Sequence, residues 1–261
     1  MDITNKKIIY ENGFEVIDLT ANITNRKYSL HLININKNSN QIFKFCNQQS
    51  SLINIKGEIK ISNNLKNEEI FLNNEDGLHI FENSYLKMSA NVESQALLAS
   101  TSLLPFEFID ELNQNFQYMK FSSYSVDKPW GWEKWYTKNI EQKAEYALKM
   151  IFMNKGNQSS LQSHLYKSET NYVIFGEANV LYGLNAPDDR SSLIDLSDLK
   201  SKIYISHEGW SNKVSELHRV IAHKTYKAIE VSTTELDDVV RWEDDSSRPD
   251  GKIEKEHKKN T

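Results

Sequence analysis

Four residues in the second half of the chain combine the side-chain types and the spacing of a metal site. Gln162 and His164 are two positions apart, so their side chains would point to the same side of one β-strand. Glu169 lies five positions further on, within reach from a neighbouring strand, and His218 comes from a later strand, in ELHRV. An amide oxygen, a carboxylate and two imidazoles suit a divalent cation. We therefore predict that these four side chains hold a metal ion.

The predicted ligand number is that of a catalytic metal rather than a structural one, because three or four protein ligands leave coordination positions open. The expected cofactor is one divalent metal, zinc in the first place, with manganese, cobalt, nickel and iron as alternatives. Burying these polar groups unpaired would cost on the order of several kcal/mol. Spacing alone still leaves a hydrogen-bonded cluster as the alternative. The other histidines are interpreted as surface or hydrogen-bonded residues: His31, His79, His207, His223 and His257.

The segments that must position these residues have the pattern of short strands. Alternating or short apolar runs, such as YALKMIFM, NYVIF, KIYIS and KAIEVS, are separated by clusters of Asn, Gly, Asp and Ser. Many short strands at this spacing predict an all-β sandwich or barrel. A helical pattern is weak and confined to 102–120 and 193–201, and the first of these is predicted to connect two halves.

The two halves of the chain look alike at a distance. SLINIKGEIKI (51–61) and NYVIFGEANVL (171–181) both have the pattern strand, Gly-Glu, strand. Superposing Gly57 on Gly176 gives an offset of 119 residues (176 − 57). A glycine between two strands permits the positive φ of a tight turn. Together with the number of strands, this similarity predicts two related barrels in tandem.

The same offset tests the first half for a metal site. It places residues without useful ligand atoms opposite the first three predicted ligands, namely Phe43, Phe45 and Ser50. His79, four positions before Asn83, could belong to a second ligand motif, but one imidazole cannot hold the metal without partners. The first barrel is therefore predicted to be degenerate, with its two phenylalanines filling the space of a metal site. Its expected role is packing, dimer contacts or one wall of the active site.

The segment LQSHLYKSETNYVIFGEANV resembles the first motif of the cupin superfamily. In its detail it is similar to the cupin domain of type II mannose-6-phosphate isomerases, which is often fused to mannose-1-phosphate guanylyltransferase. Three further segments agree in the family's order. KPWGWEKWY (128–136) resembles its Pro-Trp-Gly strand, 148–164 the strand leading into the ligand motif, and ELDDVVRWEDDSSR (235–248) its acidic closing segment. The resemblance covers about 120 residues, from Lys128 to Arg248.

This resemblance implies a ligand set, a fold and a reaction. The family has Gln at its first ligand position, which Gln162 matches, and His164, Glu169 and the pair His218-Arg219 match the following ones. The implied fold is a small double-stranded β-helix, jelly-roll-like barrel with the metal at its wide mouth. The implied activity is the interconversion of an aldose phosphate and a ketose phosphate, or a reaction of a related activated sugar, in carbohydrate metabolism such as polysaccharide biosynthesis.

Candidate roles follow from that reaction, which moves a proton between two carbons while negative charge develops on oxygen. The predicted catalytic residues are Glu177, Tyr166 and Arg219. The predicted substrate or phosphate contacts are Lys149, Lys167, Arg219 and Arg241. Each of these cations could equally be a solvated or ion-paired side chain.

The sequence departs from the family's pattern beside the ligands. The family has a histidine-rich run that ends in Arg and is followed by Glu-His-Trp. This chain has Leu-Tyr-Lys and then Glu-Thr-Asn at these positions. The imidazoles of the family are therefore absent at positions 166 and 170, and Lys167 replaces the arginine. The insertion at 183–213 also lengthens the connection to the second motif, and it could cover the pocket or pack against a partner. Metal binding survives these changes, whereas the substrate is open to change.

Two alternatives remain. One is another cupin enzyme, such as a sugar-nucleotide isomerase, epimerase or lyase, or an iron oxygenase, and the identity of the metal would discriminate between them. The other is a non-enzymatic carbohydrate-binding bicupin, with aromatic side chains stacked on sugars. The candidate aromatic residues are Trp130, Trp132, Trp135, Tyr166 and Trp210.

The predicted domains are a degenerate barrel at 1–110, a connector at 111–127, a metal-binding barrel at 128–250 and a charged, frayed tail at 251–261. A formal charge of −5 with dispersed Lys and Arg does not indicate a nucleic-acid partner. The single cysteine, Cys46, excludes an intrachain disulfide, and no run has the length of a membrane span. We expect a cytoplasmic protein that binds a sugar phosphate or nucleotide sugar and no membrane, with a homodimer formed through sheet edges as a further expectation.

Overall fold

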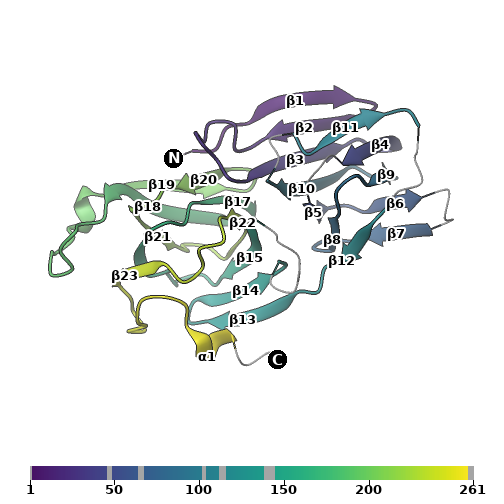
Figure 1. Cartoon of the computed structure of the whole chain (residues 1–261). Coiled ribbons are helices and arrows are strands. Elements are labelled where there is room, and N and C mark those ends of the chain that lie inside the picture. Colours follow the sequence, from purple (N-terminus) through teal and green to yellow (C-terminus); the bar gives the residue numbers. More distant parts are fainter. Residues whose placement is uncertain are drawn as a thin grey trace. The chain divides into compact units, whose positions relative to one another are not determined.

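The computed structural model describes residues 2–45, 49–63, 68–101, 104–111, 116–137 and 145–257. In these ranges the chain is almost entirely β, with one 3-10 turn and one short helix beside its strands (Figure 1). It divides into two compact units, one of Thr4–Ser122 and one of Met1–Ile3 with Ser123–Thr261. The all-β class predicted from the strand pattern is confirmed. Cys46 lies outside the described residues.

The N-terminal unit consists of two antiparallel sheets. Its larger sheet has the order β1 (Lys6–Glu11), β2 (Phe14–Asp18), β3 (Ser29–Ile35), β10 (Ser94–Ser100), β5 (Ser50–Lys56), β8 (Gly77–Ile80) and β12 (Tyr118–Lys120). Its smaller sheet has the order β11 (Phe106–Ile109), β4 (Ser39–Phe45), β9 (Tyr85–Ala90), β6 (Ile59–Asn63) and β7 (Glu68–Leu72).

The C-terminal unit also has two antiparallel sheets. One has the order β13 (Tyr124–Lys128), β14 (Gly131–Trp135), β15 (Ala147–Met153), β22 (Tyr226–Ser232), β17 (Glu169–Phe175) and β20 (Gly209–Asn212). The other has the order β19 (Lys200–Ile205), β18 (Glu177–Asn185), β21 (Glu216–Ile221), β16 (Leu161–His164) and β23 (Val239–Glu243). The 3-10 turn η1 (Leu196–Asp198) lies between β18 and β19, and the helix α1 (Glu254–His257) follows β23.

The two units share one topology. Strands β1, β2, β3, β10, β5 and β8 correspond in order to β13, β14, β15, β22, β17 and β20, and β11, β4, β9, β6 and β7 correspond to β23, β16, β21, β18 and β19. The predicted offset holds at the turns after β5 and β17, where Gly57 has φ 75° and Gly176 has φ 76°. A Cβ at either glycine would lie 2.6 Å or less from a backbone carbonyl oxygen, so both turns require glycine.

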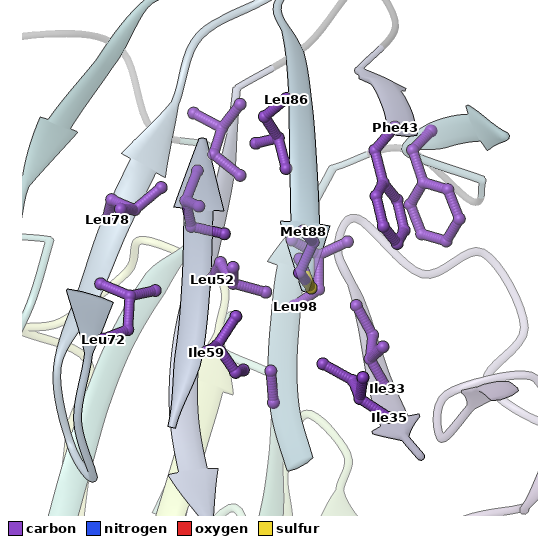
Figure 2. Close-up of a cluster of buried hydrophobic side chains, with 14 of the residues drawn as sticks. Ile33, Ile35, Phe43, Leu52, Ile59, Leu72, Leu78, Leu86, Met88 and Leu98 are labelled. Atoms are coloured by element: carbon purple, nitrogen blue, oxygen red, sulfur yellow. The ribbon is translucent and has the colours of Figure 1, made fainter. Parts of the chain in front are cut away.

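The core of the N-terminal unit is apolar and lies between its sheets (Figure 2). Phe43 and Phe45 on β4 are fully buried, and the ring of Phe43 packs edge to face on those of Phe14 and Phe106, with ring centroids 5.5 and 5.1 Å apart. Leu86 on β9 is paired with Phe43 and is equally buried. The two phenylalanines therefore fill the interior, as the repeat predicts.

The connector at 102–120 is not helical where it is described. It contributes the edge strands β11 and β12, because Phe106 and Phe108 alternate with polar neighbours and pair with Phe45 and Phe43 on β4. Residues 102–103 and 112–115 lie outside the described residues. In 193–201 only η1 is helical, with the carboxylate of Asp195 accepting a hydrogen bond from the backbone N–H of Ser197.

Both ends of the described chain pack on the C-terminal unit. Asp2 forms a β-bridge with Trp210, and its carboxylate accepts hydrogen bonds from Lys202 Nζ and the Tyr204 hydroxyl, both at 2.6 Å. Helix α1 lies against β13, where Glu256 pairs with Lys128 at 2.7 Å. Residues 258–261 of the predicted tail lie outside the described residues. Among the described residues, no helix has the length and apolar character needed to span a membrane.

Candidate metal centre

Three strands of the C-terminal unit bring the predicted ligands together. Gln162 and His164 lie on β16 with the alternation that directs both to one face, and His218 on β21 is the direct Cα partner of Gln162. Glu169 is the first residue of β17, on the opposite sheet. The barrel closes these sheets around a polar interior, so residues separated by up to 56 positions (218 − 162) meet.

The ligand atoms are close enough to share one ion. Nitrogen atoms of His164 and His218 and an oxygen of Glu169 all lie within 4.8 Å of one another. His164 Nε2 is 3.7 Å from Glu169 Oε2, and His218 Nε2 is 3.4 Å from Glu169 Oε1. The amide of Gln162 is beside them, with its Nε2 3.2 Å from His218 Nε2. Rotating that amide would present its oxygen to the same point, since amide oxygen and nitrogen are assigned from their surroundings.

Both imidazoles are held with Nε2 toward this point. His164 Nδ1 is 2.9 Å from Asp238 Oδ1, and His218 Nδ1 is 3.0 Å from the backbone oxygen of Glu216. Asp238 is itself fixed, because the backbone N–H groups of Tyr166 and Lys167 donate to its Oδ2 at 2.8 and 2.7 Å. A proton on each Nδ1 leaves the lone pair of Nε2 for a metal, which is the usual outer support of a metal-binding histidine.

These residues fit a divalent cation. His164 Nε2 is buried and has no hydrogen-bond partner, a costly arrangement unless a ligand binds there. Burial lowers the pKa of His218 to about 4, so this imidazole is neutral at neutral pH, the form that binds metals. The donor set of imidazole, carboxylate and amide groups suits a borderline metal rather than calcium or magnesium.

A buried ionic cluster lies directly behind the ligands. Lys167 Nζ is 2.6 Å from Glu169 Oε2 and 2.9 Å from Glu230 Oε1, and Lys149 Nζ is 3.2 Å from Glu230 Oε2 and 3.0 Å from Glu133 Oε1. Burial raises the pKa of Glu133, but the nearby ammonium groups of Lys149 and Lys128 outweigh burial and hold it well below its usual range. Glu133 and Glu169 are therefore carboxylates at neutral pH, and Lys149 and Lys167 are ammonium groups.

The cluster holds more acidic than basic side chains. Its acidic members are Glu133, Glu169, Glu230 and Asp238. Its basic members are Lys149, Lys167 and Lys128, whose Nζ lies 3.4 Å from Glu133 Oε2. A buried excess of acidic groups is expensive without a counterion, so this excess favours a cation at the ligand atoms.

The ligands open into a cavity of about 440 Å³. Its walls combine the ionic cluster with aromatic residues, including Trp130, Trp135 and Tyr226. The closing segment contributes Arg241, Arg248 and residues 251–253. A volume of this size accommodates a small polar substrate beside the metal.

The residues predicted as catalytic lie away from this cavity. Glu177 begins β18 and pairs with Lys224 at 2.9 Å, and the Tyr166 side chain is 69% exposed. Arg219 follows a ligand on β21, so its side chain points to the other face, where it pairs with Glu243 at 3.0 Å. None of the three lines the cavity.

The predicted substrate contacts divide differently. Lys149, Lys167 and Arg241 all line the cavity, but the two lysines are engaged by carboxylates of the cluster. Arg219 does not line it. Of the insertion at 183–213, only Trp210 lines the cavity. Ala186, Ile194 and Leu196 instead join Trp242 in packing against a separate cluster of Leu161, Leu199 and Leu217.

Three acidic residues of this site were not identified from the sequence. Two of them, Glu133 and Glu230, are buried within strands, in GWEKW and KAIEVS. A glutamate inside an otherwise apolar strand was the signal that could have identified them. Asp238 is one of two adjacent aspartates in ELDDVV, and only the fold shows that it supports His164 whereas Asp237 is exposed.

Comparison with known proteins shows the fold. No protein-family model matches the sequence, and no curated protein is similar to it in sequence. A structure of oxalate decarboxylase from Bacillus subtilis is similar with a TM-score of 0.64, covering 89% of this chain and 75% of that chain at 11% identity. AerE from Microcystis aeruginosa is similar with a TM-score of 0.62, covering 90% and 99% at 10% identity. These likenesses show a cupin fold in its tandem form.

Proposed function

We propose that the chain is a metal-dependent cupin enzyme acting on a small polar substrate in the C-terminal barrel. One observation carries this proposal: a buried His164 Nε2 without a hydrogen bond converges with Glu169 and His218 at the edge of a cavity of about 440 Å³. Gln162, His164, Glu169 and His218 would hold the ion, and Asp238 would keep His164 in the binding tautomer.

We further propose that the substrate is a sugar phosphate and that the reaction interconverts an aldose and a ketose. The resemblance of 128–248 to mannose-6-phosphate isomerases supports this choice. A bound divalent metal would polarise the substrate's carbonyl and stabilise negative charge developing on its oxygen atoms.

The protein's own groups would complete the site. Lys149 lies in the cavity wall between Glu133 and Glu230, where its ammonium group can donate a hydrogen bond to a substrate oxygen. Trp130 and Trp135 are almost completely buried beside the cavity and would limit the access of water to the reacting atoms.

A panel of hexose phosphates tests this activity directly. The full chain, purified, stripped of metal and reloaded with zinc, manganese, cobalt or nickel, should interconvert at least one aldose phosphate and ketose phosphate. Activity should disappear with a chelator and in Glu169→Ala, provided that circular dichroism shows a folded protein. A metal-loaded protein that leaves every hexose phosphate unchanged would contradict the isomerase assignment.

A second candidate is chemistry on a small carboxylate, as in a decarboxylase or an iron oxygenase. It is favoured by the likeness to oxalate decarboxylase, whose name gives oxalate as its substrate, and by the cations in the cavity wall. Activity with manganese or iron(II) on oxalate-like acids, with release of carbon dioxide or consumption of oxygen, would select this candidate over the isomerase.

A further inference from the structure

Arg241 differs from the other cations that line the cavity. Among the described residues, no carboxylate oxygen lies within 4.0 Å of its guanidinium nitrogens, whereas every other lysine or arginine side chain of the lining forms an ion pair. It lies on β23 directly opposite Gln162 on β16, and both side chains line the cavity. Directly paired residues of antiparallel strands have Cβ atoms about 5 Å apart, so Arg241 begins beside a predicted metal ligand.

The guanidinium of Arg241 is positioned but only partly used. Its Nη1 donates hydrogen bonds to the backbone oxygens of Pro249 and Gly251, the second at 2.8 Å. Its Nε is buried without a hydrogen-bond partner. A guanidinium has five N–H donors, and the edge formed by Nε and Nη2 is one of those that bind oxyanions through two parallel hydrogen bonds. That edge of Arg241 is therefore left for a ligand.

The carboxylates around Arg241 are already neutralised by other cations. The pairs are Asp244 with Arg248 at 2.6 Å, Asp250 with Arg190 at 3.2 Å and Glu256 with Lys128 at 2.7 Å. Burial, and next the charge of Arg248, lower the pKa of Arg241 from its usual value, although a guanidinium remains charged at any physiological pH. Among the described cations of the cavity lining, Arg241 is therefore the one whose side chain has no ion pair.

We propose that Arg241 binds an oxyanion carried by the substrate, a phosphate or a carboxylate, while the substrate's reacting end lies at the metal. This inference rests on the proposed metal-dependent function and adds the residue that binds the anionic group of the substrate. Arg241 is thereby a specificity residue, because a neutral sugar would leave its buried donors unsatisfied.

Anion binding to the manganese-loaded full chain tests the proposal by isothermal titration calorimetry, with inorganic phosphate and acetate as separate probes. In Arg241→Gln, the Kd of the better probe should rise about 10-fold or more. Arg241→Lys should restore part of that loss, because it keeps the charge but not the fork. The control is Lys224→Gln, which removes an exposed cation of the same barrel that does not line the cavity and should change the Kd less than about twofold.

Three results would overturn the inference. They are equal anion affinities in Arg241→Gln and the unaltered chain, an equal loss in Lys224→Gln, or a loss of manganese affinity in Arg241→Gln as large as the loss of anion affinity. Failure of this inference can be distinguished from failure of the proposed function. Arg241-dependent anion binding without turnover of any sugar phosphate supports the inference and contradicts the isomerase. Turnover with an unchanged KM in Arg241→Gln contradicts the inference and leaves the isomerase standing.

Discussion

The two barrels of this chain have the same strand order, but they carry side chains of different chemistry at matched interior positions. On β4 and β9 of the first barrel, Phe43 pairs with Leu86, both of which are labelled in Figure 2. On β16 and β21 of the second barrel, Gln162 pairs with His218. The position of Glu169 at the start of β17 is taken by Ser50 at the start of β5. The fold therefore accepts an apolar cluster and a ligand cluster at the same places.

The difference extends to the ionic cluster. Sheet pairing places Leu98 and His31 of the first barrel where the second has Glu230 and Lys149, and Val16 where it has Glu133. Since the first barrel forms the same sheets with fewer buried charges, those of the second are not needed for the topology. Buried ion pairs contribute little net stability compared with well-packed apolar groups, so their presence indicates a function.

Breaking the ionic cluster should have the largest effect on stability. Lys149→Met leaves Glu133 and Glu230 buried with fewer cations, and we expect the free energy of unfolding to fall by about 3–5 kcal/mol. Urea unfolding followed by circular dichroism measures it. The control is Lys7→Met in the first barrel, whose pair with Glu15 is 52% and 31% exposed and should contribute less than about 1 kcal/mol. Equal effects of the two changes would contradict the difference drawn between the barrels.

Truncating the matched positions Phe43 and Gln162 should separate packing from binding. Phe43→Ala opens a hole in a fully buried aromatic cluster and should cost about 3–5 kcal/mol of unfolding free energy while leaving metal affinity unchanged. Gln162→Ala should weaken metal binding and cost less stability. Urea unfolding and metal titration of both variants measure the two effects, and a loss of metal affinity in Phe43→Ala would contradict the assignment.

Removing the outer support of His164 should have a smaller effect, confined to binding. Asp238→Asn removes the carboxylate that fixes Nδ1, and metal affinity should fall about 10- to 100-fold. Competition with a chromogenic chelator measures this affinity. Asp237→Asn is the matched control, because it is the neighbouring exposed carboxylate. An unchanged affinity in Asp238→Asn would show that the imidazole is oriented by other contacts.

The first barrel retains one buried ion pair, and its effect should appear as acid sensitivity. Burial raises the pKa of Asp18, but the hydrogen bonds from Arg26 and Thr20 outweigh burial and lower it below the unfolded value of about 3.9. The stabilisation from Asp18 is therefore present above about pH 4 and is lost as the pH falls through the lowered pKa. Unfolding free energies measured from pH 5 to pH 2 should show a shallower decline in Asp18→Asn, and parallel curves would contradict this account.

The fold class, the repeat and the convergence of His164, Glu169 and His218 were predictable because each depends on a local sequence pattern. Strand alternation, a glycine at matched turns and Gln-x-His at strand spacing are short-range patterns. The weak helical pattern of 102–120 was misleading in its described part, because Phe106 and Phe108 are fixed by pairing with β4, a contact made across about sixty residues. Long-range pairing is what a local pattern does not contain.

The roles of the residues around the candidate ligands depend on which face of its strand each side chain lies on, and the sequence shows this only in part. Arg219 stands next to a ligand in the sequence but lies on the other face of β21, whereas Arg241 faces the cavity through its register with Gln162. Strand register is set by the whole sheet, so the sequence alone could not show which of these arginines faces the cavity. His79 likewise is not at a ligand position. It lies on β8, next to β5, where its Nδ1 is 2.8 Å from the hydroxyl oxygen of Ser51. The position matched to His218 is occupied by Leu86.

Metal stoichiometry tests the central assignment most directly. The full chain, stripped of metal and titrated with manganese or zinc, should bind one ion per chain, and binding should raise the melting temperature of the second barrel. His218→Leu, which introduces the residue type of the matched position Leu86, should abolish binding in a folded protein. One ion per chain lost in that variant is the predicted result. Binding that survives His218→Leu, or no binding by the unaltered chain, would contradict the assignment.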